Sequence, residues 1–214
     1  MPFAAQCPRM NSPGFELRAA SPSDTVTIAA LSVQVFLDTY ATQGVGPDLA
    51  REAFTEYSAE AFARRLDEPD RAFILAEAGA GLLGYAEVLL LPLIAPAAQW
   101  SGAELVRLYV QPAAQRLGIG RALLENTAQA VLAANIPAVW LTVWDGNDNA
   151  RAFYARMGYA DVGATTYSLQ GHTYANRVFA KQLAATFQPL QSVPRDGGSL
   201  DFSQVPKGYR SAKE

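Results

Sequence analysis

The chain has 214 residues, half of them apolar and a tenth aromatic, which is enough to build the core of one domain. Its formal net charge of −3 argues against a nucleic-acid-binding protein, which would usually carry a basic surface, and is compatible with a cationic partner. Cys7 and His172 are the only cysteine and the only histidine. The sequence therefore offers no internal disulfide and no Cys/His metal site, and without a GxSxG elbow we expect no Ser-His-Asp triad.

Neither the N-terminal stretch nor the longest apolar run indicates a membrane or secretory segment. Prolines interrupt residues 1–13, which lack the apolar core of a secretory signal. The longest apolar run, 88–98, contains Pro92 and Pro96 and is too short to span a bilayer. We therefore expect a cytoplasmic protein with no membrane or nucleic-acid partner.

The predicted elements begin after an N-terminal arm, residues 1–14. A strand is expected at 15–19, followed by a helix that Ser21 caps and whose apolar residues recur at helical spacing. Two further short helices are expected at 48–57 and 58–66.

A predicted hairpin follows, formed by strands at 72–78 and 82–91 and joined by glycines. Pro92 is expected to end the second strand, so that a loop over 93–102 precedes a strand at 104–110. The remaining elements are a helix from Ile119 that ends before Asn135, a strand at 138–144, a helix at 149–157, and strands at 159–169 and 172–183.

This order predicts a single α/β (α+β) domain over residues 15–185. We expect a mixed, mostly antiparallel sheet of about seven strands, flanked by helices on both faces. Residues 186–214 contain Pro, Gly and Ser without periodicity and are predicted to form a C-terminal tail.

The stretch "VQPAAQRLGIGRALLEN" places Gly118 and Gly120 between a strand and a helix. The first N–H groups of a helix lack partners, and glycine lets phosphate oxygens approach them closely, so this turn is a candidate anion site. Leu123 stands where a dinucleotide fingerprint has its third glycine, and no GxxxxGK[ST] string occurs, so nucleotide binding is disfavoured. The alternative is a helix that merely begins with flexible residues.

Two motifs connect this turn to a known family. "QRLGIG", from Gln115 to Gly120, resembles the Q/R-x-x-G-x-G/A signature of the GCN5-related N-acetyltransferase (GNAT) superfamily. "NDNARAFYARMGY", residues 147–159, resembles the family's second block, N-x-x-A-x-x-F/L-Y-x-x-x-G-F/Y. The resemblance covers roughly residues 15–183 and implies an acyl-CoA-dependent N-acetyltransferase.

The resemblance also implies a binding site for acetyl-coenzyme A and needs no metal. The loop that would hold the pyrophosphate consists of Gln115, Arg116, Leu117, Gly118, Ile119, Gly120 and Arg121. The backbone of Leu108, Tyr109 and Val110 would hydrogen-bond the pantetheine arm like an extra strand. Asn147 lies where the family has a cofactor-contacting asparagine, with a helix cap as the alternative.

The family transfers the acetyl group from a thioester to an amine by direct attack. With an ammonium pKa of about 10.4, only roughly one amine in 2,500 is a free nucleophile near pH 7, and the leaving thiolate needs a proton. The resemblance implies that Tyr154 is the general acid and contacts the sulfur, with packing as the alternative. Glu104 would be the general base, with a solvated carboxylate as the alternative, and alternation places it on one face with Val106.

The acceptor is less well defined. The N-terminal helices and the last strand resemble a subgroup with polyamine and small-amine acetyltransferases. Asp48, Glu52, Glu56 and Glu60 recur every four residues and would form an acidic stripe suited to a polycation, unless Ser58 breaks the helix; a solvated face is the favoured interpretation. A protein N-terminus, an antibiotic or an amino acid as acceptor, a non-catalytic acyl-coenzyme A module and a homodimer all stay open.

Overall fold

The computed structural model describes residues 14–79, 81–96, 100–169 and 172–183. Apart from Gly14, the predicted arm over 1–14 lies outside the described residues, and so does the predicted tail over 186–214.

Seven strands form one sheet in the order β1-β2-β3-β4-β5-β7-β6. The strands are β1 (Glu16–Ala19), β2 (Arg71–Ala78), β3 (Gly81–Ile94), β4 (Ser101–Val110), β5 (Ala138–Trp144), β6 (Ala160–Leu169) and β7 (His172–Gln182). Every neighbouring pair is antiparallel except β4 and β5, which are parallel. The predicted mixed, mostly antiparallel sheet is confirmed.

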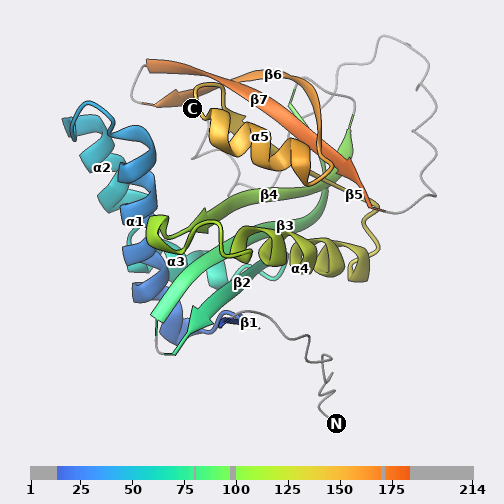
Figure 1. The fold of residues 1–214 in the computed structure, drawn as a ribbon, viewed down its shortest axis with the longest axis horizontal. Coiled ribbons are helices and arrows are strands. Elements are labelled where there is room, and N and C mark those ends of the chain that lie inside the picture. The colour runs from blue at the N-terminus through green and yellow to red at the C-terminus, as the bar shows by residue number, and fades with distance from the viewer. Residues whose placement is uncertain (1–13, 80, 97–99, 170–171, 184–214) are drawn as a thin grey trace.

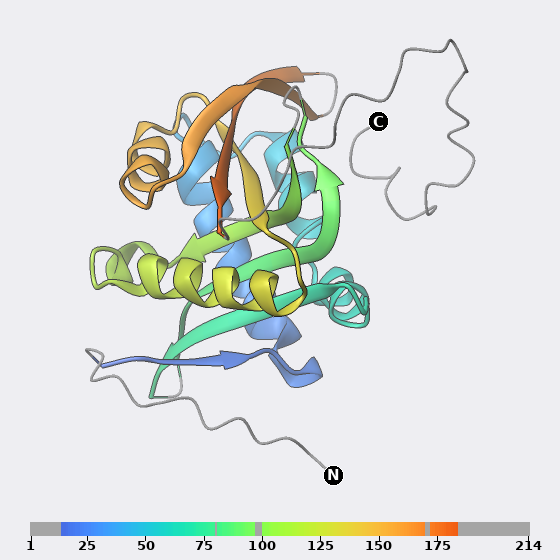
Figure 2. The ribbon, with the colours of Figure 1, turned by 90° about the vertical axis from the view of Figure 1, so that its right-hand side faces the viewer.

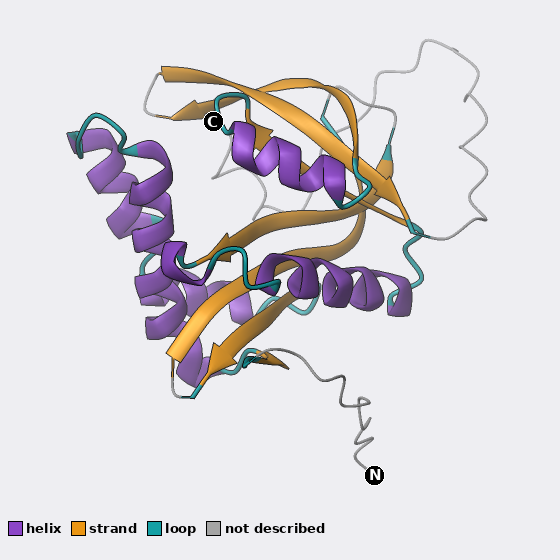
Figure 3. Ribbon diagram, in the orientation of Figure 1, coloured by secondary structure: helices purple, strands orange, loops and turns teal. Residues whose placement is uncertain are grey.

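Helices cover both faces of this sheet (Figures 1, 2 and 3). They are α1 (Thr25–Tyr40), α2 (Pro47–Thr55), α3 (Ala59–Leu66), α4 (Ile119–Ala133) and α5 (Asp148–Arg156). On one face, apolar side chains of α1, α2 and α3 pack with Phe73, Leu75 and Tyr85 of the sheet. On the other face, side chains of α4 and α5 pack over residues such as Ala86 and Leu141, so each face has its own core.

The acidic residues of α2 and α3 do not form a continuous stripe. Ser58 has an extended backbone, and its hydroxyl accepts a hydrogen bond from the Ala61 N–H at 3.2 Å, which caps α3. Glu56 and Glu60 therefore lie on either side of a helix break, and the stripe expected for one continuous helix is absent from this part of the described chain.

The expectation that Pro92 ends the second hairpin strand was wrong. Strand β3 continues to Ile94, and β4 begins at Ser101. Both strands therefore extend into the predicted loop over 93–102 and shorten it. The β3–β4 register is interrupted between Leu89 and Leu93, where a missing proline N–H removes no regular ladder hydrogen bond.

The sheet divides between β4 and β5. These strands pair only at Ala103 with Val139 and at Glu104 with Trp140. Beyond Glu104, β4 stays paired with β3 as far as Val110, whereas β5 stays paired with β7 as far as Trp144. The carboxyl halves of the two parallel strands therefore separate, and this split positions the candidate site.

Candidate functional site

The split leaves one edge of β4 open. The Gln111 N–H donates to the Leu83 carbonyl of β3 at 2.8 Å. Alternation along an antiparallel pair then turns the backbone N–H and C=O groups of Leu108 and Val110 toward the side that β5 has left. Within the described chain no strand pairs with this edge, so the predicted pantetheine-binding triplet lies where an extended ligand could add a strand.

The glycine turn lies directly after this open edge. Gly118 has φ +84° and caps α4, and Arg116 also adopts a left-handed conformation, with φ +65°. A Cβ on Gly118 would meet no atom within 4 Å, so glycine is favoured here by its backbone angle. Because the N–H groups of Ile119, Gly120 and Arg121 open the helix, they lack intrahelical acceptors, so an anion could accept hydrogen bonds from them.

The two sequence motifs meet at Gly120. A Cβ built on Gly120 would lie 3.3 Å from the Cζ atom of Phe153 on α5. Glycine at this position therefore permits close packing of α4 against α5 as well as close approach of a ligand.

The side chains of the loop differ in their surroundings. Ile119 is buried in the core, whereas Leu117 is exposed. The Arg121 guanidinium forms an ion pair with Glu125 at 2.7 Å, and the Gln115 side-chain amide makes a long contact of 3.5 Å with the Val110 carbonyl. The loop therefore offers an anion mainly its backbone.

Asn147 caps a helix, which was the predicted alternative to a cofactor contact. Its side-chain oxygen accepts a hydrogen bond from the Ala150 N–H at 3.0 Å and caps α5. The predicted cofactor contact of Asn147 stays a prediction.

Tyr154 is buried on α5. Its ring lies 5.4 Å from Phe153, 5.7 Å from Tyr159 and 6.2 Å from Phe179, measured between ring centroids. Burial raises the pKa of the Tyr154 phenol well above its usual value, and Tyr159 and Tyr40 add to that shift. The phenol is therefore protonated at neutral pH and able to donate a hydrogen bond or a proton, while its ring also contributes to packing.

Glu104 lies at the point where β4 and β5 separate. It pairs with Trp140 in the last step of the parallel ladder and with Leu89 on the other side, and it is half-buried. This position puts the predicted general base at the closed end of the split.

A β-bulge changes which face each β4 side chain occupies. The register with β3 shifts between Glu87 and Val88, which leaves Val106 as the extra residue. Leu105 and Leu108 consequently pack into the same core beneath α4. The alternation expected from Glu104 onward therefore breaks at Val106, and Arg107 and Tyr109 point to the face covered by α1 and α3.

That face contains a buried charge cluster that sequence reasoning missed. Glu87 is fully buried and pairs with Arg71 at 2.5 Å and with Arg107 at 2.6 Å. Burial by itself would raise the pKa of Glu87, but Arg107, Arg71 and Arg65 outweigh it, so the pKa lies below its usual value. The available signal was a single glutamate inside the apolar strand "GYAEVLLL".

An aromatic wall, consisting of Phe36, Tyr40, Tyr57, Tyr109 and Trp144, extends from β4 to the end of β5. Phe36 lies 5.1 Å from Tyr40 and 5.0 Å from Tyr57, and Tyr40 lies 5.8 Å from Trp144, between centroids. The Tyr57 and Tyr109 hydroxyls are 3.0 Å apart. The wall therefore reaches the open edge of β4 from the side opposite α4 and α5.

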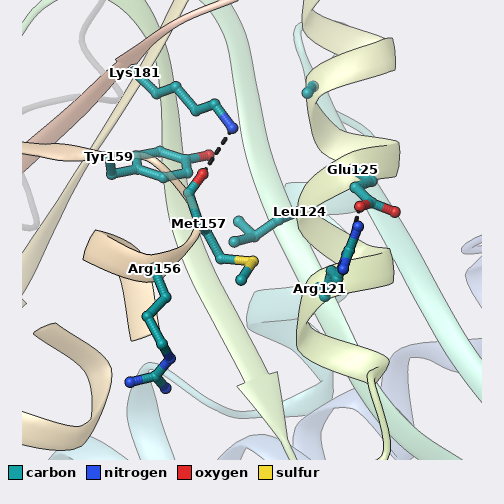
Figure 4. Close-up of a pocket in the computed structure, with 8 residues that line it drawn as sticks. Arg121, Leu124, Glu125, Arg156, Met157, Tyr159 and Lys181 are labelled. Carbon is teal, nitrogen blue, oxygen red and sulfur yellow. Dashed lines mark hydrogen bonds and ion pairs between the residues drawn. The ribbon is translucent and has the colours of Figure 1, made fainter. Parts of the chain in front are cut away.

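A cavity of about 300 Å³ lies between α4 and α5 (Figure 4). Arg121 and Glu125 line it from α4, while Arg156 and Lys181 line it from the other side. The Lys181 ammonium donates to the Met157 carbonyl at 2.7 Å. Three cationic side chains and one carboxylate line the cavity, which favours an anionic group in it. One wall of the cavity is α4, the helix that follows the glycine turn.

In the part of the chain that the structure describes, no cluster of three or more His, Cys, Asp or Glu side chains could hold a metal ion. No described helix has both the length and the apolar composition needed to cross a membrane.

Comparison with known proteins agrees with this arrangement. The model of the acetyltransferase (GNAT) family matches residues 38–159. An uncharacterised N-acetyltransferase of Mycobacterium tuberculosis is 26% identical over 162 residues, which cover 75% of this chain and 99% of that protein. An uncharacterised N-acetyltransferase from the pepI 3′ region of Lactobacillus delbrueckii subsp. lactis is 23% identical over 145 residues, covering 68% and 84% of the two chains.

Solved structures share the fold. The PaiA N-acetyltransferase of Thermoplasma acidophilum, crystallised with coenzyme A, has a TM-score of 0.60 and 24% identity, covering 78% of this chain and 98% of that one. A ribosomal-protein-alanine N-acetyltransferase of Brucella melitensis has a TM-score of 0.58 and 20% identity, covering 78% and 99%. These likenesses show the fold and leave the acceptor open.

Proposed function

The chain belongs to the acetyltransferase (GNAT) family, and we propose that it moves an acetyl group from acetyl-coenzyme A to a primary amine of a polyamine or another small molecule. The family membership makes it an acyl-CoA-dependent acetyltransferase. The proposal specifies where the donor binds, which groups are catalytic and which class of acceptor is used.

One observation carries the proposal: β4 and β5 separate after Glu104, and the open β4 edge leads to the Gly118 turn. An extended ligand that has amides along an arm and phosphates at its end matches this arrangement. The arm can pair with Leu108 and Val110 as an added strand, and the phosphates can accept from the first N–H groups of α4.

The residues present fit acetyl-coenzyme A. The space where a Gly118 Cβ would stand is open, and the N–H groups of Ile119, Gly120 and Arg121 start the helix beside it. When bound, acetyl-coenzyme A supplies the thioester carbon that the amine attacks. The protein's task is then to orient the amine, remove its proton and protonate the leaving thiolate.

Glu104 and Tyr154 are suited to these two proton transfers. The Glu104 carboxylate, at the closed end of the split, would accept the ammonium proton directly or through a water. Tyr154 stays protonated because burial raises the pKa of its phenol, so it has a proton to give to a thiolate. Tyr154 lies on α5 and is buried in the core that α4 and α5 cover.

A thermal-shift screen followed by a thiol-release assay tests the proposal. We expect acetyl-coenzyme A to raise the melting temperature more than ATP, and small amines to release coenzyme A. Greater stabilisation by ATP would contradict the donor assignment, and acetyl-coenzyme A binding without turnover over a broad amine panel would contradict catalysis. Activity on peptides but on no small amine would contradict the acceptor class.

A further inference from the structure

Glu52 on α2 is a half-buried carboxylate with little to balance its charge. Its one hydrogen bond among the described residues comes from the Tyr167 hydroxyl at 3.3 Å, longer than the roughly 2.5–3.0 Å usual for O–H···O bonds. Burial raises the pKa of Glu52, and the neighbouring Glu56 adds to this shift. Taking an ionised carboxylate out of water is unfavourable unless a cation or several donors replace the lost hydration.

The nearby arginines are engaged by other carboxylates. Arg65 pairs with Glu56 at 3.0 Å, and Arg107 pairs with Glu87 at 2.6 Å. No ion pair to Glu52 occurs within 4 Å in the described part of the chain. Both arginines act on Glu52 only at longer range, where they oppose the rise in its pKa.

The Glu52–Tyr167 contact connects α2 with β6, near the proposed reaction centre. It joins residues 115 positions apart, from α2 and β6, and Figure 1 shows α2 beside the hairpin end of β6 and β7. Ala53, next to Glu52 on α2, packs in the same core as Tyr57 and Tyr109, and the hydroxyls of these two tyrosines are 3.0 Å apart. Tyr57 and Tyr109 therefore connect the surroundings of Glu52 with β4.

From this geometry we infer that Glu52, with Tyr167, binds a second positive charge of the acceptor, so that the substrate is a small diamine or longer polyamine. The reactive amine lies at the split between β4 and β5, and the distal ammonium supplies the cation that Glu52 lacks. The aromatic wall, which includes Tyr57 from the core around α2 and Tyr109 from β4, favours a flexible methylene chain and a cation over its faces. The inference rests on the proposed function, because it specifies the acceptor of that site.

The test compares 1,5-diaminopentane with 1-aminopentane, which differ only in the second amine. For the wild-type protein we expect kcat/KM to be about 10- to 100-fold higher for the diamine, the range of a charge-assisted hydrogen bond. In Glu52→Gln, which keeps the acceptor oxygen for Tyr167 but removes the charge, the ratio should fall to near 1. The KM for acetyl-coenzyme A and the rate with 1-aminopentane should stay within about twofold.

Glu60→Gln is the matched control, because it makes the same charge change at an exposed position of the neighbouring helix and should keep the wild-type ratio. Diaminoalkanes of three to eight carbons add a second readout: the wild-type protein should show an optimum length, and Glu52→Gln should show none. A wild-type ratio of 1 or less, or an unchanged ratio in Glu52→Gln, would overturn the inference.

Calorimetric binding of 1,5-diaminopentane separates this inference from the proposed function. Binding that Glu52→Gln loses, without turnover of any amine, would support the subsite and contradict the transferase proposal. Acetylation of 1-aminopentane and 1,5-diaminopentane with equal efficiency would support the transferase and contradict the subsite. If 1,5-diaminopentane neither binds nor reacts, the subsite is wrong.

Discussion

Tyr154 combines a packed ring with a phenol that burial keeps protonated. If it protonates the leaving thiolate, Tyr154→Phe removes the proton and keeps the packing. We expect kcat to fall about 100-fold, the lower range for general acid catalysis, with the KM for acetyl-coenzyme A changed less than about threefold. Steady-state thiol release measures both constants.

Tyr159→Phe controls for the loss of a buried hydroxyl in the same ring cluster. Its centroid lies 5.7 Å from that of Tyr154, and burial also raises the pKa of its phenol. Turnover should persist in this variant. Wild-type kcat in Tyr154→Phe would assign Tyr154 to packing alone.

Glu104 is tested by pH dependence, because a lost base changes the form of the profile. If Glu104 accepts the ammonium proton, Glu104→Gln leaves deprotonation to the amine itself, whose pKa is about 10.4. The rate should then keep rising with pH toward that value, so the profile moves to higher pH. A Glu104→Gln profile that is parallel to the wild-type profile at all pH values would make this residue structural.

At the scale of elements, the turn between β4 and α4 must allow α4 to pack against α5 and must also admit a phosphate. Two substitutions of Gly120 separate these requirements. Gly120→Ala and Gly120→Glu both add a Cβ 3.3 Å from Phe153, so both disturb α4–α5 packing. Only the glutamate brings a negative charge to the anion site. We expect coenzyme A affinity, measured by calorimetry, to fall at least about 100-fold in Gly120→Glu and far less in Gly120→Ala.

Thermal unfolding of the two variants supplies the control for stability. If both melt at similar temperatures but differ in coenzyme A affinity, charge repulsion by the ligand explains the difference. Similar affinities in Gly120→Ala and Gly120→Glu would remove the turn from the phosphate site.

Patterns that depend on neighbouring residues were predicted well. The strand over 138–144 and the start of α4 at Ile119 were predicted at their observed positions, because apolar runs, caps and glycines report local backbone preferences. The bulge at Val106 was not predictable in this way, since it is defined by the register with β3. A bulge shifts every later side chain to the opposite face, so the alternation that starts at Glu104 does not extend beyond Val106.

In the candidate site, too, the local motifs were predictable, whereas the contacts between distant residues were not. Its motif residues could be found because the glycine turn and the start of α5 are contiguous in sequence. The Glu52–Tyr167 contact joins residues 115 apart, and helical spacing alone had grouped Glu52 with solvated neighbours. The pairs of Glu87 with Arg71 and Arg107 also join three strands, so they follow from sheet order rather than from any local pattern.

At the scale of the whole molecule, the split sheet needs a rigid half on the β3 side, because the open β4 edge has lost β5 as a partner. Two features of the structure provide that rigidity, the apolar cores and a buried pair of salt bridges. Cores lie on both faces of β2, β3 and β4. Glu87, at the centre, ties β2 and β4 to β3 through two buried arginine pairs. Removing its charge should therefore weaken the entire fold.

We expect Glu87→Gln to lower the free energy of unfolding by about 3 kcal/mol at pH 7, because it leaves two arginines facing a neutral amide. The pKa of Glu87 in the fold lies below its unfolded value of about 4.3, so its stabilisation is present above that pH and is lost as pH falls through the folded pKa. The gap between the wild-type and Glu87→Gln curves should therefore narrow as the pH falls below about 4.3. Urea unfolding from pH 7 to pH 3 measures the gap.

Glu77→Gln provides the surface comparison for this prediction. Glu77 pairs with Arg18 at 2.6 Å, but the Arg18 side chain is 41% exposed, so its loss should cost less than about 1 kcal/mol. A gap between wild type and Glu87→Gln that stays constant from pH 7 to pH 3 would show that the amide disturbs packing rather than charge. In that case the two arginines would be balanced by other neighbours, and the rigidity of the β3 side would rest on its apolar cores.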